Sequence, residues 1–62
     1  MIRLKELRKQ VNQTQEQLAA ALGVSQNAIS QYENGNRKIP PDLIAKLCEL
    51  FNCSADHLLG LA

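Results

Sequence analysis

Apolar residues recur at helical spacing in five separate segments of the 62-residue chain, and the pattern predicts no strands. The expected helices cover residues 2–10, 15–22, 26–34, 41–51 and a last short stretch at 55–59. The longest of them has a broad apolar stripe that should face a core, made of Leu43, Ile44, Leu47, Cys48 and Phe51. We therefore predict an all-α fold, a compact five-helix domain that occupies residues 1–62 as a single unit.

Two of the predicted helices are separated by a turn of only three residues. Thr14 and Gln17 have the spacing of a capping box at the start of the first helix. Gly23 suits the left-handed end of that helix, and Ser25 suits the cap of the next. Ala19 is small and lies where the two helices should cross, so their backbones can approach closely. These signals predict a helix-turn-helix around which the chain is organised.

The second helix of this pair has two unlike faces. With about 100° of rotation per residue, its inner face is apolar and contains Ala28, Ile29 and Tyr32. Its outer face carries neutral polar side chains, namely Gln26, Asn27, Ser30, Gln31 and Asn34. Such a face is either a merely polar surface or a surface that reads bases in the DNA major groove, where amide side chains pair well with adenine. We favour base reading, first by Gln26 and Asn27 and then by Ser30 and Gln31.

The stretch from Thr14 to Gly35, which contains both helices and the turn, resembles the Cro-type helix-turn-helix family, the XRE-like group of phage and bacterial repressors. The shared residues stand at fixed spacing and are Thr14, Gln15, Leu18, Ala19, Leu22, Gly23, Val24, Ser25, Gln26, Ile29, Ser30, Tyr32, Glu33, Asn34 and Gly35. The resemblance covers nearly the whole chain and implies a lambda-repressor-like fold. It also implies an ion pair between Arg8 and Glu33 that ties the first helix to the helix at residues 26–34, the reading helix. The alternative is that Arg8 and Glu33 are two solvated surface charges.

Contacts with the DNA backbone are a further implication of the resemblance. Gln15 should touch a phosphate and support Gln26, and the remaining phosphate contacts should be Asn34, Asn36, Arg37 and Lys38. The net charge of only +1 argues mildly against a nucleic-acid partner if it is treated as an average. The distribution of charge argues the other way, because the basic residues crowd the first ten positions and the loop after the reading helix, whereas several acids lie in the C-terminal half.

Other chemistry finds little support in the sequence. Cys48 and Cys53 lack the spacing of a zinc site or of a secreted disulfide framework, so we interpret them as small buried apolar residues. No serine, cysteine or histidine has partners for catalysis, and we expect neither an enzyme, a cofactor, a metal nor a small-molecule ligand. The chain has no long apolar run and no signal-peptide pattern, so we expect a cytoplasmic protein without a membrane partner.

These observations predict sequence-specific binding of double-stranded DNA by a transcriptional regulator, most simply a repressor. The alternative is a helix-turn-helix that binds proteins, as in antitoxins or adaptors to the transcription machinery. One reading helix covers few base pairs, so we expect a homodimer on a palindromic operator. The predicted dimer interface consists of His57, Leu58 and Leu61. The alternative is that Leu58 and Leu59 cap the core while Leu61 frays.

Overall fold

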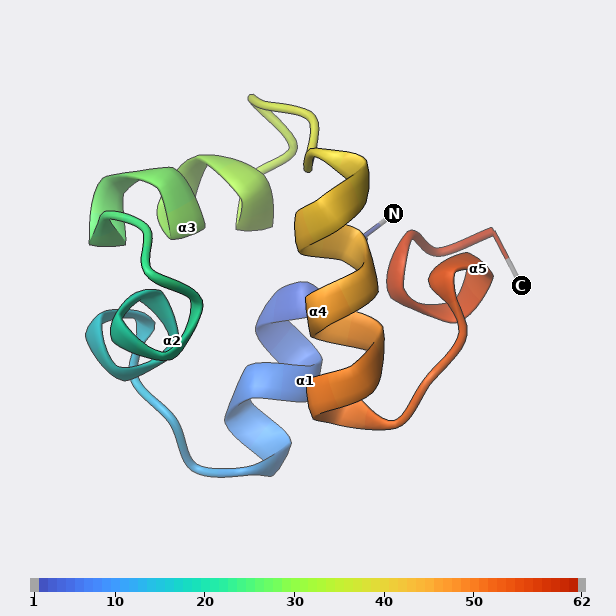
Figure 1. The fold of residues 1–62 in the computed structure, drawn as a ribbon, viewed down its shortest axis with the longest axis horizontal. Coiled ribbons are helices and arrows are strands. Elements are labelled where there is room, and N and C mark those ends of the chain that lie inside the picture. Colours follow the sequence, from blue (N-terminus) through green and yellow to red (C-terminus); the bar gives the residue numbers. More distant parts are fainter. Residues whose placement is uncertain (1, 62) are drawn as a thin grey trace.

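The computed structural model describes residues 2–61, and its secondary structure within that range consists of five helices. The helices are α1 (Leu4–Gln10), α2 (Gln15–Leu22), α3 (Gln26–Glu33), α4 (Pro41–Phe51) and α5 (Ala55–Leu58). Helices α1 and α4 occupy the middle of the molecule, with α2 and α3 on one side and α5 on the other (Figure 1). The predicted all-α class is confirmed, and the predicted bounds of α2 and α4 agree with those observed.

Every helix contributes to one shared core. The five largest fully buried side chains come one from each helix, and they are Leu4, Leu18, Ile29, Leu47 and Leu58. The remaining buried apolar side chains surround them and include Ala28 and Tyr32 on the inner face of α3. Because the core draws on all five helices, α3 is held in place by the whole domain and not by α2 alone.

The helix-turn-helix has the local structure that its sequence predicts. Thr14 Oγ1 accepts a hydrogen bond from the Gln17 backbone N–H (3.1 Å), and Gln17 Oε1 accepts one from the Thr14 N–H (2.9 Å), which completes the capping box. Gly23 ends α2 with φ of 70°, a value that disfavours any side chain even though no atom lies within 4 Å of where a Cβ would stand. Ser25 Oγ then accepts from the Ala28 N–H (3.1 Å) and starts α3.

The burial of Leu58 contradicts its assignment to the dimer interface and agrees with the alternative that it caps the core. Its side chain is fully buried, and its carbonyl accepts a hydrogen bond from the Arg3 backbone N–H (2.8 Å), so α5 is docked against the start of the chain. Leu59 is half-buried, whereas Leu61 is 74% exposed. Leu58 is therefore a core residue that cannot contribute to a partner surface.

Candidate nucleic-acid interface

The outer face of α3 carries neutral polar side chains next to the turn. Gln26 and Asn27 are exposed at its first turn, and Ser30 and Gln31 are partly exposed one turn later. Asn34 caps the end of the helix and is exposed as well. Since Ala28, Ile29 and Tyr32 are buried on the opposite side, the helix can rotate little without exposing core residues, which fixes the direction of its polar face.

The start of α2 lies beside this face. Gln15, Gln26, Asn27 and Ser30 together line a shallow hollow of about 360 Å³. The hollow therefore joins the first turns of two helices, where unpaired backbone N–H groups and the helix dipole favour an anion such as a phosphate. The structure thus brings Gln15 together with three of the four residues predicted to read bases.

A buried network of polar side chains ties α3 to α1 and α2. Arg8 Nε donates to Glu33 Oε2 (2.7 Å), and Arg8 Nη2 donates to Glu33 Oε1 (3.3 Å). Gln15 Nε2 donates to the same Oε1 (2.9 Å), and Arg8 Nη1 donates to the Gln13 carbonyl (2.7 Å). The side chains of Arg8 and Glu33 are only 10% and 1% exposed, so they form a buried pair and are not two solvated surface charges.

This network also bears on how Gln15 can act. Sequence reasoning linked Gln15 to Gln26, but its amide nitrogen donates to the Glu33 carboxylate. A glutamine amide has two N–H donors, so the second remains for a ligand at the hollow. The contact holds Gln15 in one orientation because its partner Glu33 is itself fixed by Arg8.

The loop after α3 carries the remaining predicted phosphate contacts. Asn36, Arg37 and Lys38 are all exposed, and the buried side chain of Ile39 anchors the end of the loop. The Arg37 guanidinium lies 5.4 Å from the centre of the Tyr32 ring, a cation–π contact that the sequence pattern did not reveal. The loop follows the C-terminal end of α3, whereas Gln15 borders the hollow with Gln26, Asn27 and Ser30 and reaches Glu33 with its amide.

The other candidate sites lie apart from this surface. Cys48 and Cys53 are free and half-buried against the core, more exposed than predicted. Burial, reinforced by the neighbouring Cys48 thiol, raises the pKa of the Cys53 thiol, so the protonated form dominates at neutral pH. His57 is exposed on α5. Residues 2–61 contain no cluster of metal-ligating side chains and no helix with the length and apolarity to cross a bilayer.

Comparisons with known proteins agree with this geometry. Residues 4–58 match a family model described as helix-turn-helix. The chain is 41% identical over 58 residues to the HTH-type transcriptional regulator ImmR of Bacillus subtilis (strain 168), covering 94% of this chain and 46% of that protein. It is also 41% identical over 56 residues to a competence pilus inhibition repressor of Acinetobacter baylyi (strain ATCC 33305 / BD413 / ADP1), covering 90% and 51%.

A third relative is the antitoxin PezA of Streptococcus pneumoniae serotype 4 (strain ATCC BAA-334 / TIGR4), which is 39% identical over 57 residues, covering 92% of this chain and 36% of that protein. The chain thus spans about half the length of the two regulators and about a third of the antitoxin. No solved structure matches it significantly.

Proposed function

Because this chain belongs to the helix-turn-helix family, we propose that it binds double-stranded DNA sequence-specifically as a transcriptional regulator, most simply a cytoplasmic repressor, with α3 in the major groove. The observation that carries the proposal is the outer face of α3, which exposes Gln26 and Asn27 at the first turn of a helix whose other face is buried. The major groove admits one α-helix and displays a distinct donor and acceptor pattern for each base pair.

The proposed roles follow the arrangement of the surface. Gln26 and Asn27 make the first base contacts and Ser30 and Gln31 the next, because residues at the start of a recognition helix reach base edges. Gln15 holds a phosphate at the hollow that it shares with Gln26, Asn27 and Ser30. The remaining phosphate contacts are Asn34, Asn36, Arg37 and Lys38. Phosphates are bound by lysine and arginine and also by neutral donors and helix N-termini. A net charge of +1 is therefore compatible with this function.

Replacement of Gln26 by alanine should weaken binding to the preferred site by about 1 to 3 kcal/mol and relax the preference at one base pair. Lys38→Ala should instead weaken binding to all sequences alike, because phosphates carry no sequence information. Titration of both variants against the preferred duplex and against its single-base variants measures the difference. Gln10→Ala, an exposed glutamine on α1, is the control. An unchanged base preference in Gln26→Ala would show that this face does not read the groove.

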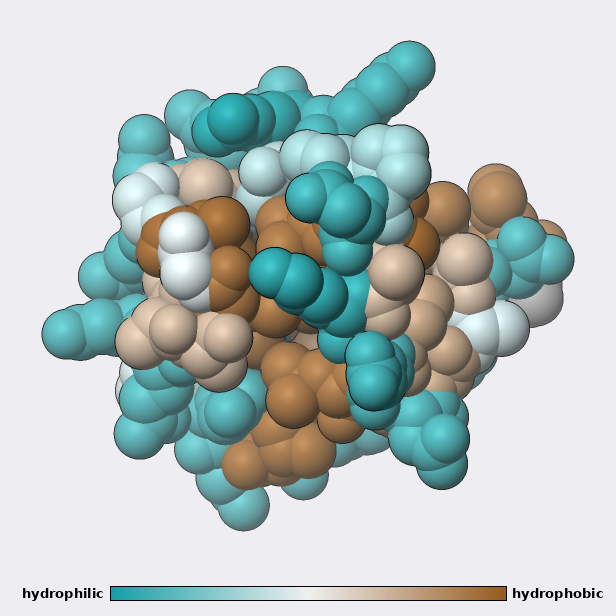
Figure 2. All heavy atoms as spheres, in the orientation of Figure 1, coloured by the Kyte–Doolittle hydropathy of each residue, from teal (hydrophilic) through white to brown (hydrophobic). Residues whose placement is uncertain are grey.

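We further propose that two copies bind a palindromic operator. The longest extent of one chain is 27 Å, whereas half-sites on one face of DNA are about 34 to 36 Å apart. Each half-site therefore needs its own copy of the chain. The exposed Leu61 and the neighbouring His57 are the candidate contacts, without Leu58. Apolar atoms reach the edge of the molecule on the side of α5 (Figures 1 and 2), and exposed apolar surface often marks a partner site.

Light scattering of the protein with a palindromic duplex should therefore give two protomers per duplex. Leu61→Ser should reduce this to one, whereas Val11→Ser, which changes another exposed apolar residue (53% exposed), should not. One protomer on the palindrome for the unmodified protein would reject the dimer.

The match to the antitoxin PezA and the low net charge favour a second candidate, a helix-turn-helix that binds a protein partner. Binding to random-sequence duplex at low salt separates the two functions. A DNA-binding regulator shows measurable nonspecific affinity that falls as salt rises, whereas a protein-binding module shows almost none.

A further inference from the structure

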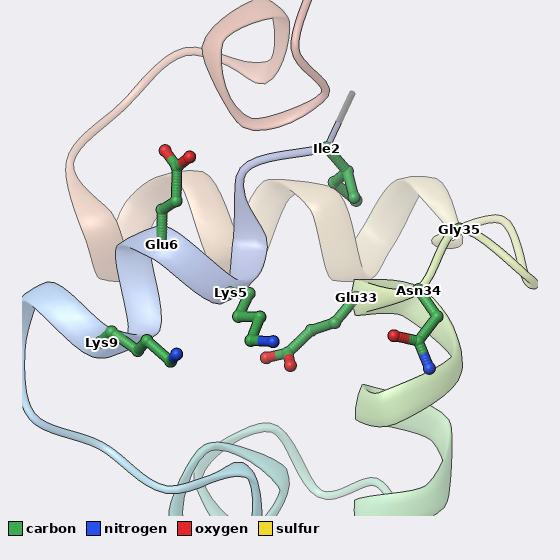
Figure 3. A pocket seen from close by; sticks show the side chains of 7 residues that line it. All are labelled: Ile2, Lys5, Glu6, Lys9, Glu33, Asn34 and Gly35. Atoms are coloured by element: carbon green, nitrogen blue, oxygen red, sulfur yellow. The ribbon is translucent and has the colours of Figure 1, made fainter.

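A second hollow borders Glu33, and Gln15 does not line it. It has a volume of about 370 Å³ and is open between α1 and the C-terminal end of α3. Its lining includes Lys5 and Lys9 from α1 and Glu33 and Asn34 from the end of α3 (Figure 3). The hollow therefore adjoins the proposed DNA surface and shares Asn34 with it, whereas Lys5 and Lys9 have no contact assigned above.

The side chains that line this hollow include two lysines and one acid, Glu6, that take part in no ion pair among the described residues. Lys5 and Lys9 are one helical turn apart on α1, both are exposed, and neither forms an ion pair within the described part of the chain. Figure 3 shows both side chains extending toward the end of α3, while Glu6 points to the other side of α1.

Glu33 does not cancel this charge. Its Oε2 accepts from Arg8 (2.7 Å), and its Oε1 accepts from both Arg8 and Gln15. The carboxylate is thus neutralised and hydrogen-bonded inside the domain, with its side chain 1% exposed. What the hollow presents to a ligand is two ammonium groups beside the Asn34 amide, a set of donors for an anion.

From this juxtaposition we propose that Lys5 and Lys9 bind phosphates of the DNA backbone, and so continue the row of contacts from Gln15 and Asn34 onto α1. The proposal rests on the proposed function, since it requires α3 to lie in the major groove. Lysine suits this task because its ammonium is a compact point charge on a flexible stem, and it adapts to a phosphate without fixed geometry. These contacts add affinity and register but no base preference.

The test is the salt dependence of binding by a Lys5→Ala, Lys9→Ala double variant. Removal of one phosphate contact lowers the magnitude of the slope of log K against log salt by about 0.9, so the slope of the double variant should be smaller by about 1.8. The ratio of the affinity of the unmodified protein to that of the double variant should therefore shrink about 12-fold between 50 and 200 mM salt. Lys46→Ala, an exposed lysine on α4, is the matched control and should leave the slope nearly unchanged. Thermal melting should show all three proteins folded, because the replaced side chains are exposed.

A shortened duplex locates the contact. Removing the base pairs that flank the selected site should abolish the difference in affinity between the unmodified protein and the double variant. A slope equal to that of Lys46→Ala, or a difference that persists on the short duplex, would overturn the assignment. Disappearance of that difference on adding millimolar inorganic phosphate at constant ionic strength would also overturn it, in favour of a free-anion site. If the unmodified protein bound no duplex, the proposed function would fail first and this assignment with it.

Discussion

Arg8→Ala should lower the free energy of unfolding by about 3 to 5 kcal/mol, the usual cost of removing one partner of a buried ion pair. The destabilisation comes mainly from Glu33, whose carboxylate would stay almost fully buried with the Gln15 amide as its remaining hydrogen-bond donor. The Gln13 carbonyl would lose its donor too. A domain of this size has a total stability of only about 3 to 9 kcal/mol, so the variant should be close to unfolding at 25 °C. Urea denaturation followed by circular dichroism measures the effect.

Two controls distinguish the loss of the Arg8–Glu33 ion pair from the general effect of removing a positive charge on stability. Lys5→Ala removes an exposed cation from the same helix and should change stability by less than about 0.5 kcal/mol. The double variant Arg8→Met, Glu33→Leu removes both charges and should recover much of the stability, because a buried pair is often replaceable by apolar side chains. If Arg8→Ala cost no more than Lys5→Ala, the ion pair would not hold α3 in place.

Leu58→Ala should lower the free energy of unfolding by about 2 to 5 kcal/mol, through reduced burial of apolar surface and the cavity left behind. Leu58 is the fully buried side chain of α5, and its truncation would separate that helix from the core. Leu61→Ala is the control, because Leu61 is 74% exposed and its effect should fall within about 0.5 kcal/mol. Equal midpoints for the two variants in a urea titration would contradict the observed burial.

The position of Leu58 could not be predicted from the sequence. Leu58, Leu59 and Leu61 are close in sequence, and a helix of four residues has too few turns to define an apolar face. Only the docking of α5 against the start of the chain selects Leu58 for the core. Helix α2 was predictable to the residue because its capping box and Gly23 mark both ends, and α4 was predictable because Pro41 suits its first position and its apolar stripe ends at Phe51.

The candidate interface was predictable to a similar degree. The polar face of α3 follows from helical periodicity alone, and its burial pattern agrees with the prediction. The depth of Glu33 does not follow from it, since that residue is at the border of the helix wheel and becomes buried only because α1 and α2 close over it. The hollow beside Lys5 and Lys9 likewise depends on how α1 meets the end of α3, which no local pattern reports.

Base reading by α3 can be tested by selecting bound sequences from a random pool of duplexes, in parallel with the unmodified protein and with Gln26→Ala. We predict that the unmodified protein enriches one short motif, repeated as a palindrome, and that Gln26→Ala enriches the same motif with one position per half-site relaxed. Retention of duplexes without any common motif, or retention of none, would contradict sequence-specific reading by α3.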